Sequence, residues 1–294
     1  MLPATFTPQF LSRLELFKMR SRRAYLGSRQ GGHISPKRGH GIEFSDFRKY
    51  EIGDNPRWID WGVYARTDRL YVRRYQEEEN LSILVIIDTS ASMRTPANER
   101  KWETARDIGL ALGYVGLMEQ DSVVVAPLGQ RLSPTYQGGK AIHAMSENLL
   151  NLRFEQDDPD LVHEVQQAVS RVHFPGVAIF ISDMLMPFVE LRKIFNLMMA
   201  KNLDITAIQV LSPSDLAPLQ GSGDTLAVDS ETGEEMQISL NEDASGRYEY
   251  LLGQHNKQMR EFFGSRRVGY ALVRTDDELS SIMLTNLPKT GLIT

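Results

Sequence analysis

The sequence contains no cysteine, which excludes a disulfide framework, a thiolate metal site and a cysteine nucleophile. No stretch approaches the roughly 18–20 consecutive apolar residues that a membrane-spanning helix needs. The first residues also lack the charged segment followed by an apolar run that marks a secretory signal. Three common catalytic patterns are missing: Gly-x-Ser-x-Gly, His-Glu-x-x-His and Gly-x-x-x-x-Gly-Lys-Ser/Thr. We therefore expect a soluble, cytoplasmic protein that is not an enzyme of those classes.

The composition is that of a globular protein, but its charge is unevenly distributed. Of the 294 residues, 41% are apolar and 24% are charged, and the net charge is −5. Residues 1–80 hold fifteen Lys and Arg against ten Asp and Glu, whereas residues 81–294 hold eighteen against twenty-eight. This asymmetry predicts two modules, with a helix and a β-rich subdomain in 1–80 and a larger domain in 81–294.

From residue 81 onward, predicted strands alternate with predicted helices. This pattern is typical of an α/β fold with a doubly wound, mostly parallel sheet. Turn residues between two short β-like segments at about 220–240 predict an inserted β-hairpin. Ala105, Gly109 and Gly113 recur every four residues in the helix predicted at 99–118, which would let that helix lie close to the sheet. The expected strands are 81–87, 122–127, 177–182, 204–211 and 268–274, and the expected helices are 99–118, 141–150, 161–172, 188–201 and 247–263.

The N-terminal part is basic and aromatic. Residues 7–25 predict an amphipathic helix that docks through Phe10, Leu11, Leu14 and Phe17. The basic residues that follow favour a solvated surface over contact with nucleic acid or anionic lipid; they are Arg20, Arg22, Arg23, Arg29, Lys37 and Arg38.

Residues 31–80 mix acidic, basic and aromatic side chains. This pattern favours a web of ion pairs, with Trp58 and Trp61 supplying apolar area to a small subdomain. The alternative is that Asp54, Arg57 and Asp60 face a ligand.

Oxygen-bearing side chains follow two of the predicted strands. Asp88, Ser90 and Ser92 come directly after 81–87, and Asp183 comes directly after 177–182. Ligands of open α/β sheets bind at the carboxyl ends of strands, and we expect these two strands to be neighbours. Two buried carboxylates would repel each other unless a cation lay between them, and this ligand set suits Mg²⁺, Ca²⁺ or Mn²⁺ better than zinc. The structural alternative is that the serines cap a helix and Asp88 completes a turn.

The pattern Asp88-x-Ser90-x-Ser92 after an aliphatic strand resembles the metal-ion-dependent adhesion site of von Willebrand factor type A domains. An upstream stretch resembles the signature of the bacterial family catalogued as domain of unknown function fifty-eight. In that family the signature precedes such an A-like domain. In this chain the stretch reads Gly39-x-Gly41-x-Glu43-Phe44-x-Asp46-x-Arg48-x-Tyr50-x-x-Gly53-Asp54-x-x-Arg57-x-Ile59-Asp60-Trp61. The resemblance implies a Rossmann-type, von Willebrand factor A-like fold and partnership with MoxR-type AAA+ ATPases.

The resemblance implies metal ligands at Asp88, Ser90, Ser92 and Asp183. The family pattern offers a threonine in a middle loop, at the position where this chain has Pro159. Either Asp157, Asp158 or Asp160 replaces that ligand, or a water does, or the metal site is lost.

Three functions compete on this sequence. The favoured hypothesis is a non-enzymatic adaptor whose bound cation, most simply Mg²⁺, accepts a carboxylate from a partner protein. A Mg²⁺-dependent phosphatase of the haloacid-dehalogenase type is disfavoured because Ser90 stands where such enzymes place a second acid. Nucleic-acid binding through the basic N-terminal part lacks a recognised motif.

Overall fold

The computed structural model of the chain describes residues 2–20, 42–77, 80–154, 160–172, 176–217, 223–228, 233–240 and 242–294. The chain forms two compact units, of which the larger joins Met1–Arg29 to Asn80–Thr294 and the smaller is Gln30–Glu79. The division between residues 79 and 80 lies next to the predicted boundary, but the N-terminal helix belongs to the larger unit, because Phe10 and Leu14 join its core.

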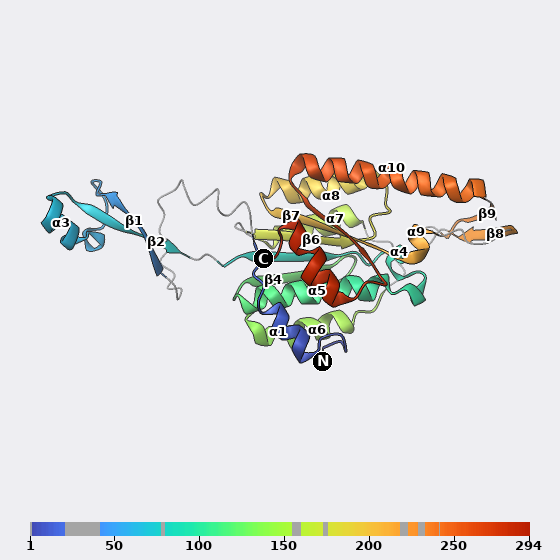
Figure 1. Ribbon diagram of the computed structural model, residues 1–294, viewed down its shortest axis with the longest axis horizontal. Helices are drawn as coiled ribbons and strands as arrows, with labels where there is room; N and C mark the ends of the chain where they lie inside the picture. The colour runs from blue at the N-terminus through green and yellow to red at the C-terminus, as the bar shows by residue number, and fades with distance from the viewer. Residues whose placement is uncertain are drawn as a thin grey trace. The chain divides into compact units, whose positions relative to one another are not determined.

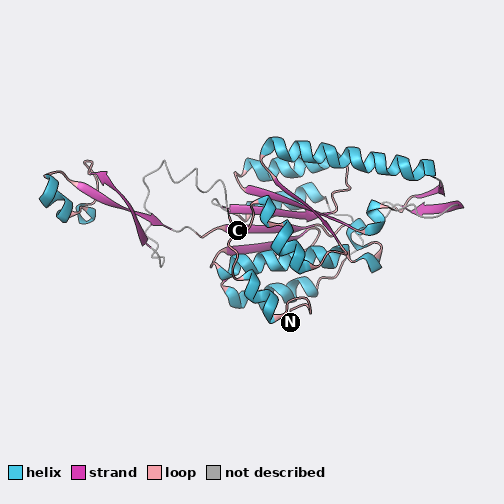
Figure 2. Ribbon diagram, in the orientation of Figure 1, coloured by secondary structure: helices cyan, strands magenta, loops and turns pink. Residues whose placement is uncertain are grey.

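The larger unit is built on one six-stranded sheet (Figures 1 and 2). Its strand order is β10-β7-β6-β3-β4-β5, and every pairing is parallel except that of β4 with β5. The α/β fold class with a mostly parallel sheet is thereby confirmed. The strands are β3 (Ser82–Ile87), β4 (Ser122–Pro127), β5 (Tyr136–Gln137), β6 (Gly176–Ser182), β7 (Asp204–Leu211) and β10 (Gly269–Arg274).

Helices cover both faces of this sheet, as Figure 1 shows. Ile83, Val85 and Ile87 of β3 belong to the core on the side of α5 (Lys101–Met118) and α6 (Ile142–Leu150). Leu84 and Ile86 belong to the core on the opposite side. The continuous apolar run of β3 follows from this arrangement, because successive side chains of a strand point to opposite faces and both faces are buried. The helices on that second side are α7 (Leu161–Ser170), α8 (Phe188–Ala200) and α10 (Glu242–Arg266).

The strip of small residues predicted in α5 faces the sheet and α6. A Cβ on Gly109 would lie 2.8 Å from Cδ1 of Ile87 and 3.2 Å from Cγ1 of Val85. A Cβ on Gly113 would lie 2.6 Å from Cε of Met145 in α6. These separations are too short for ordinary van der Waals contact, so glycine permits the close approach.

The N-terminal helix α1 (Pro8–Leu14) is shorter than the predicted span of 7–25. Thr7 caps its start, where the Thr7 side chain accepts from the backbone N–H of Phe10, and a turn at residues 15–16 follows its end. Met19 pairs in a β-bridge with Ile293, which takes the backbone away from helical geometry. The helix docks on the α5 side of the sheet through its buried Phe10 and Leu14. The predicted basic residues from 22 to 38 lie outside the described residues.

The docking of α1 predicts a contrast between two leucines. Leu14 is 0% exposed and Leu16 is 80% exposed. Leu14→Ala leaves a cavity in the core and is expected to lower the free energy of unfolding by about 2–4 kcal/mol. Leu16→Ala serves as the matched control, with a change below about 0.5 kcal/mol. Urea unfolding measures both, and equal effects would show that α1 does not belong to this core.

The smaller unit holds an antiparallel pair of strands, β1 (Ile42–Lys49) and β2 (Tyr71–Glu77), together with η1 (Pro56–Trp58) and α3 (Trp61–Thr67). The Arg48 guanidinium donates to both carboxylate oxygens of Asp54 at 2.7 and 2.8 Å and holds the pKa of Asp54 below its usual range. Asp60 caps α3 by accepting from the N–H groups of Gly62 and Val63. Both acids therefore have structural roles. Trp61 was expected to supply apolar area to the interior of this unit, but its side chain is 61% exposed.

The remaining elements lie in the larger unit. Strands β8 (Gly223–Val228) and β9 (Glu235–Leu240) pair as an antiparallel hairpin in the segment predicted to contain one. Among the described helices, none is both long and apolar enough to cross a membrane. The short helical elements are α4 (Ala91–Arg94), η2 (Ala97–Glu99), η3 (Gly139–Ala141), α9 (Pro213–Leu216), α11 (Leu279–Ser281), η4 (Ile282–Asn286) and η5 (Pro288–Thr290).

A buried acid beside β3 predicts a pH dependence of stability. Asp121 accepts from the backbone N–H of Leu81 at 2.8 Å, and burial, together with the nearby Glu119, raises its pKa to about 6. Because this value lies above that of the unfolded chain, the group favours folding at low pH, and this contribution is lost as pH rises through 6. From pH 5 to pH 8 the loss amounts to about 1 kcal/mol.

Asp121→Asn keeps an acceptor for Leu81 and removes the charge. The free energy of unfolding of the variant minus that of wild type should be larger at pH 8 than at pH 5. Urea unfolding at both pH values measures this difference. Asp243→Asn, at an exposed position in α10, is the control and should leave the pH dependence unchanged. Parallel pH profiles for wild type and Asp121→Asn would contradict the assignment.

Candidate functional site

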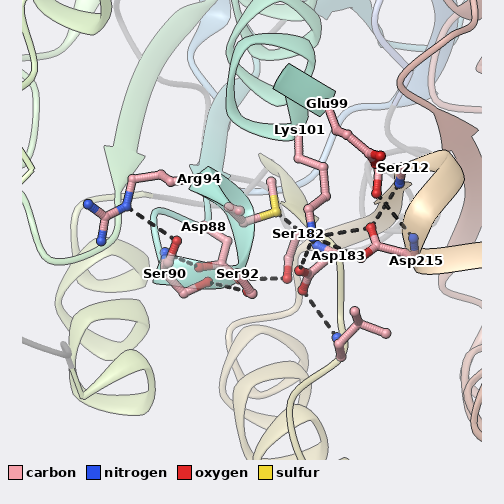
Figure 3. Close-up of polar contacts among 12 residues, drawn as sticks. Asp88, Ser90, Ser92, Arg94, Glu99, Lys101, Ser182, Asp183, Ser212 and Asp215 are labelled. Atoms are coloured by element: carbon pink, nitrogen blue, oxygen red, sulfur yellow. Dashed lines mark hydrogen bonds and ion pairs between the residues drawn. The ribbon is translucent and has the colours of Figure 1, made fainter. Parts of the chain in front are cut away.

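The predicted site residues meet at the carboxyl edge of the sheet (Figure 3). Strand β3 pairs in parallel with β6, so that Ile87 lies beside Ile181, and the backbone N–H of Asp88 donates to the carbonyl of Ile181 at 2.9 Å. The expectation that the strands before Asp88 and Asp183 are neighbours is therefore confirmed. Both aspartates are buried.

Asp88 is held by hydrogen bonds at both carboxylate oxygens. Oδ1 accepts from the backbone N–H of Ser90 at 2.9 Å, and Oδ2 accepts from the hydroxyl of Ser182 at 2.6 Å. Burial and, secondly, the charge of Asp183 raise the pKa of Asp88 to about 6, although these hydrogen bonds oppose the shift. The site thus concentrates negative charge in a place where water cannot screen it.

The two serines of this loop bring their hydroxyls together. Ser90 stands at the N-cap position of α4, but its hydroxyl makes no capping hydrogen bond to that helix. Instead, its Oγ lies 3.1 Å from Oγ of Ser92. Adjacent ligands of an octahedral ion at roughly 2.1 Å are about 3.0 Å apart. The two serine hydroxyls are hydrogen-bonded to each other, at a spacing that a small, hard divalent cation would also accommodate.

A lysine that the sequence analysis did not single out reaches the same site from α5. The ammonium of Lys101 lies 3.2 Å from Oδ2 of Asp183 and 3.1 Å from the carboxylate of Asp215, and its side chain is only 3% exposed. Oδ1 of Asp183 accepts from the backbone N–H of Leu185 at 3.2 Å. Lys101 therefore supplies one of the charges that two neighbouring carboxylates require.

A third loop, after β7, completes this edge. Ser212 and Asp215 form a capping box at α9, and Oγ of Ser212 lies 3.1 Å from Oγ of Ser214. The carboxylate of Glu99 accepts from the hydroxyl of Ser214 at 2.8 Å. Burial raises the pKa of Glu99, but hydrogen bonds from Ser212 and Ser214 outweigh it and hold the pKa below the usual range. The Ser-x-Ser-Asp pattern that follows the predicted strand 204–211 is the signal that would have identified this loop.

Beneath the site, Gln209 fixes the backbone of Asp183. Its Nε2 donates to the carbonyl of Asp183 at 2.9 Å and to Oδ1 of Asn256 at 3.2 Å, while its Oε1 accepts from the hydroxyl of Tyr270 at 2.6 Å. The next residue, Met184, adopts a left-handed conformation with φ of 56°, which a methionine rarely does. The turn that presents Asp183 is thus held by a satisfied, buried polar network.

The donor set fits Mg²⁺, with Ca²⁺ and Mn²⁺ as chemically similar alternatives. Lys101 pairs with Asp183 and Asp215, and the carboxylates of Asp88 and Glu99 lie at the same edge, so the acids there outnumber the one lysine. Within the described ranges, no cluster of three or more His, Cys, Asp or Glu has the arrangement of a metal centre. A cation would therefore depend on serine hydroxyls and water in addition to the two predicted aspartates.

The middle loop is only partly described. Asp160 caps α7, where its Oδ1 accepts from the backbone N–H groups of Val162 and His163 at 3.1 Å. Pro159, Asp157 and Asp158 lie outside the described residues.

Comparison with known proteins places the chain in a family. Residues 46–260 match the family described as "Protein of unknown function DUF58". The chain belongs to this family. It is 25% identical over 246 residues to "Uncharacterized protein Rv1480" of Mycobacterium tuberculosis and likewise to "Uncharacterized protein Mb1516" of Mycobacterium bovis, covering 79% of this chain and 74% of each relative.

Two solved structures are distantly similar to this DUF58 protein. One is the conserved hypothetical protein BatB from Bacteroides thetaiotaomicron, with a TM-score of 0.41 and 13% identity. The other is an aerotolerance-related membrane protein from Bacteroides fragilis, with a TM-score of 0.43 and 16% identity. Each comparison covers 72% of this chain and 99% of the solved chain.

Proposed function

We propose that this DUF58 protein is a non-enzymatic adaptor that binds a partner protein through a divalent-cation site, with Mg²⁺ as the cation and a partner carboxylate as the group it accepts. The observation that carries the proposal is the convergence of Asp88, Ser90, Ser92 and Asp183 at one edge of the sheet, with the serine oxygens 3.1 Å apart.

In this proposal the two serine hydroxyls hold the cation, and Asp88 and Asp183 orient its waters. The cation would supply a positive centre with a coordination position open to an acidic side chain of the partner. The chain's own residues prepare the site in advance: Ser182 and the Ser90 backbone fix Asp88, and Gln209 fixes the backbone of Asp183.

Two features of Asp88 support binding rather than phosphoryl transfer. Both of its oxygens already accept hydrogen bonds, which weakens the carboxylate as a nucleophile. The residue two positions later is Ser90, which cannot act as the general acid that a phosphatase of this type requires.

We propose a MoxR-type AAA+ ATPase as the partner. This part of the proposal rests on the resemblance of the chain to its family, and the cation site provides the chemical means for reversible association with an acidic group on the ATPase.

Cation binding is tested by thermal and urea unfolding with and without Mg²⁺. Wild-type protein should be stabilised by about 2.7 kcal/mol at a Mg²⁺ concentration one hundred times its Kd. Asp88→Asn should be more stable than wild type in chelator, because a buried charge is removed, yet should lose the response to Mg²⁺. Ser90→Ala should lose the response as well.

Ser214→Ala is the matched control for Ser90→Ala. It removes one hydroxyl of a serine pair with the same 3.1 Å spacing in the neighbouring loop, and it should keep the full response to Mg²⁺. A wild-type protein that Mg²⁺, Ca²⁺ and Mn²⁺ all fail to stabilise would rule out the cation site.

Partner binding is tested by capture of the purified MoxR-type ATPase from the same organism on immobilised wild-type protein. We expect capture in Mg²⁺, at least a tenfold reduction in excess chelator, and a similar reduction for Asp88→Asn in Mg²⁺. Capture that neither change affects would leave the ATPase as a partner and exclude the cation as the link. Failure of capture in every condition would exclude this ATPase.

A further inference from the structure

Lys101 occupies an unusual place for a lysine. It lies in the first turn of α5 and is buried, whereas lysines are almost never fully buried unless they are paired. The residue before it, Arg100, has a left-handed φ of 56°, a conformation that is unfavourable for a non-glycine residue. The surrounding structure therefore maintains a local backbone strain at the point where the lysine enters the interior.

The contacts of Lys101 link two loops of the site. Its ammonium bridges Asp183, at the end of β6, and Asp215, in α9 after β7. The three residues come from elements far apart in sequence, and Figure 3 shows them converging beside the Asp88 loop. Asp183 is also one of the residues assigned to the divalent cation. One carboxylate thus serves two cationic partners.

We propose that Lys101 is a resident cation of this site, which competes with the divalent cation for Asp183 and thereby keeps the affinity for that cation low. When no divalent cation is bound, Lys101 holds the loops after β6 and β7 together. This inference rests on the proposed function and adds a residue that determines how tightly the cation binds.

The charges of the site explain the competition. Removing Lys101 leaves Asp183 and Asp215 without their shared ammonium, close to the acids Asp88 and Glu99, so the cation-free protein loses stability. The same removal frees Asp183 and takes away a positive charge that repels an incoming divalent ion. Stability without cation and affinity for cation should therefore change in opposite directions.

The experiment uses the full chain, with Mg²⁺ as the probe, in isothermal titration calorimetry at constant ionic strength. Lys101→Met should bind Mg²⁺ at least tenfold more tightly than wild type. In chelator, the same variant should unfold at a lower urea concentration than wild type, and saturating Mg²⁺ should remove most of that difference.

A second variant keeps the test decisive if Lys101→Met does not fold. Lys101→Met combined with Asp215→Asn removes one charge of each sign, and the asparagine keeps an acceptor for the N–H of Ser212, which donates to Asp215 at 2.8 Å. This variant should fold and should also bind Mg²⁺ more tightly than wild type. Asp215→Asn alone is the control, because it leaves Lys101 paired with Asp183 and should not tighten binding.

The outcomes separate this inference from the proposed function. Equal or weaker Mg²⁺ binding by both Lys101 variants overturns the competition and leaves the cation site intact. Binding by the Lys101 variants but not by wild type supports the competition and overturns Mg²⁺-dependent adaptor function in the natural protein. Absence of binding by wild type and both variants overturns both.

Discussion

The parallel pairing of β3 with β6 is the constraint on which the site depends. Both strands are buried on both faces, and their register brings the residues that follow them, Asp88 and Asp183, to the same edge of the sheet. Two carboxylates in this position repel each other strongly because little water separates them. The elements around them, including the Ser90–Ser92 loop, the start of α5 and the loop after β7, are arranged in ways that reduce this repulsion.

The protein reduces the repulsion by two different means. Hydrogen bonds from Ser182 and from the backbone of Ser90 stabilise Asp88, whereas the ammonium of Lys101 stabilises Asp183. The hydrogen bonds to Asp88 do not fully offset its burial and the charge of Asp183, because the pKa of Asp88 still rises to about 6. The negative charge that remains lies beside the loop that carries Ser90 and Ser92, which is why we propose that a cation binds there.

The sequence predicted the strands and both aspartates, but not the charges that accompany them. Long aliphatic runs identify buried strands, and position at a carboxyl end identifies Asp88 and Asp183 without any knowledge of contacts. Lys101 is separated from Asp183 by 82 positions, and a lysine in an amphipathic helix is ordinarily read as exposed. The end of α1 likewise could not be predicted, because a long-range bridge between Met19 and Ile293 follows it. Trp61 is exposed because the smaller unit offers too little structure to bury it.

Two serine pairs with the same 3.1 Å spacing lie at this edge, and we propose only the Ser90–Ser92 pair as a cation site. The hydroxyl of Ser214 already donates to Glu99, and the neighbouring Asp215 is paired with Lys101. A divalent ion at that pair would have to displace the hydrogen bond from Ser214 to Glu99. The Ser90–Ser92 pair instead follows the buried Asp88, which accepts hydrogen bonds from Ser182 and from the Ser90 backbone rather than from an ammonium. Local spacing alone therefore does not distinguish the two pairs, and our proposal of the Ser90–Ser92 pair depends on the partners of the surrounding carboxylates.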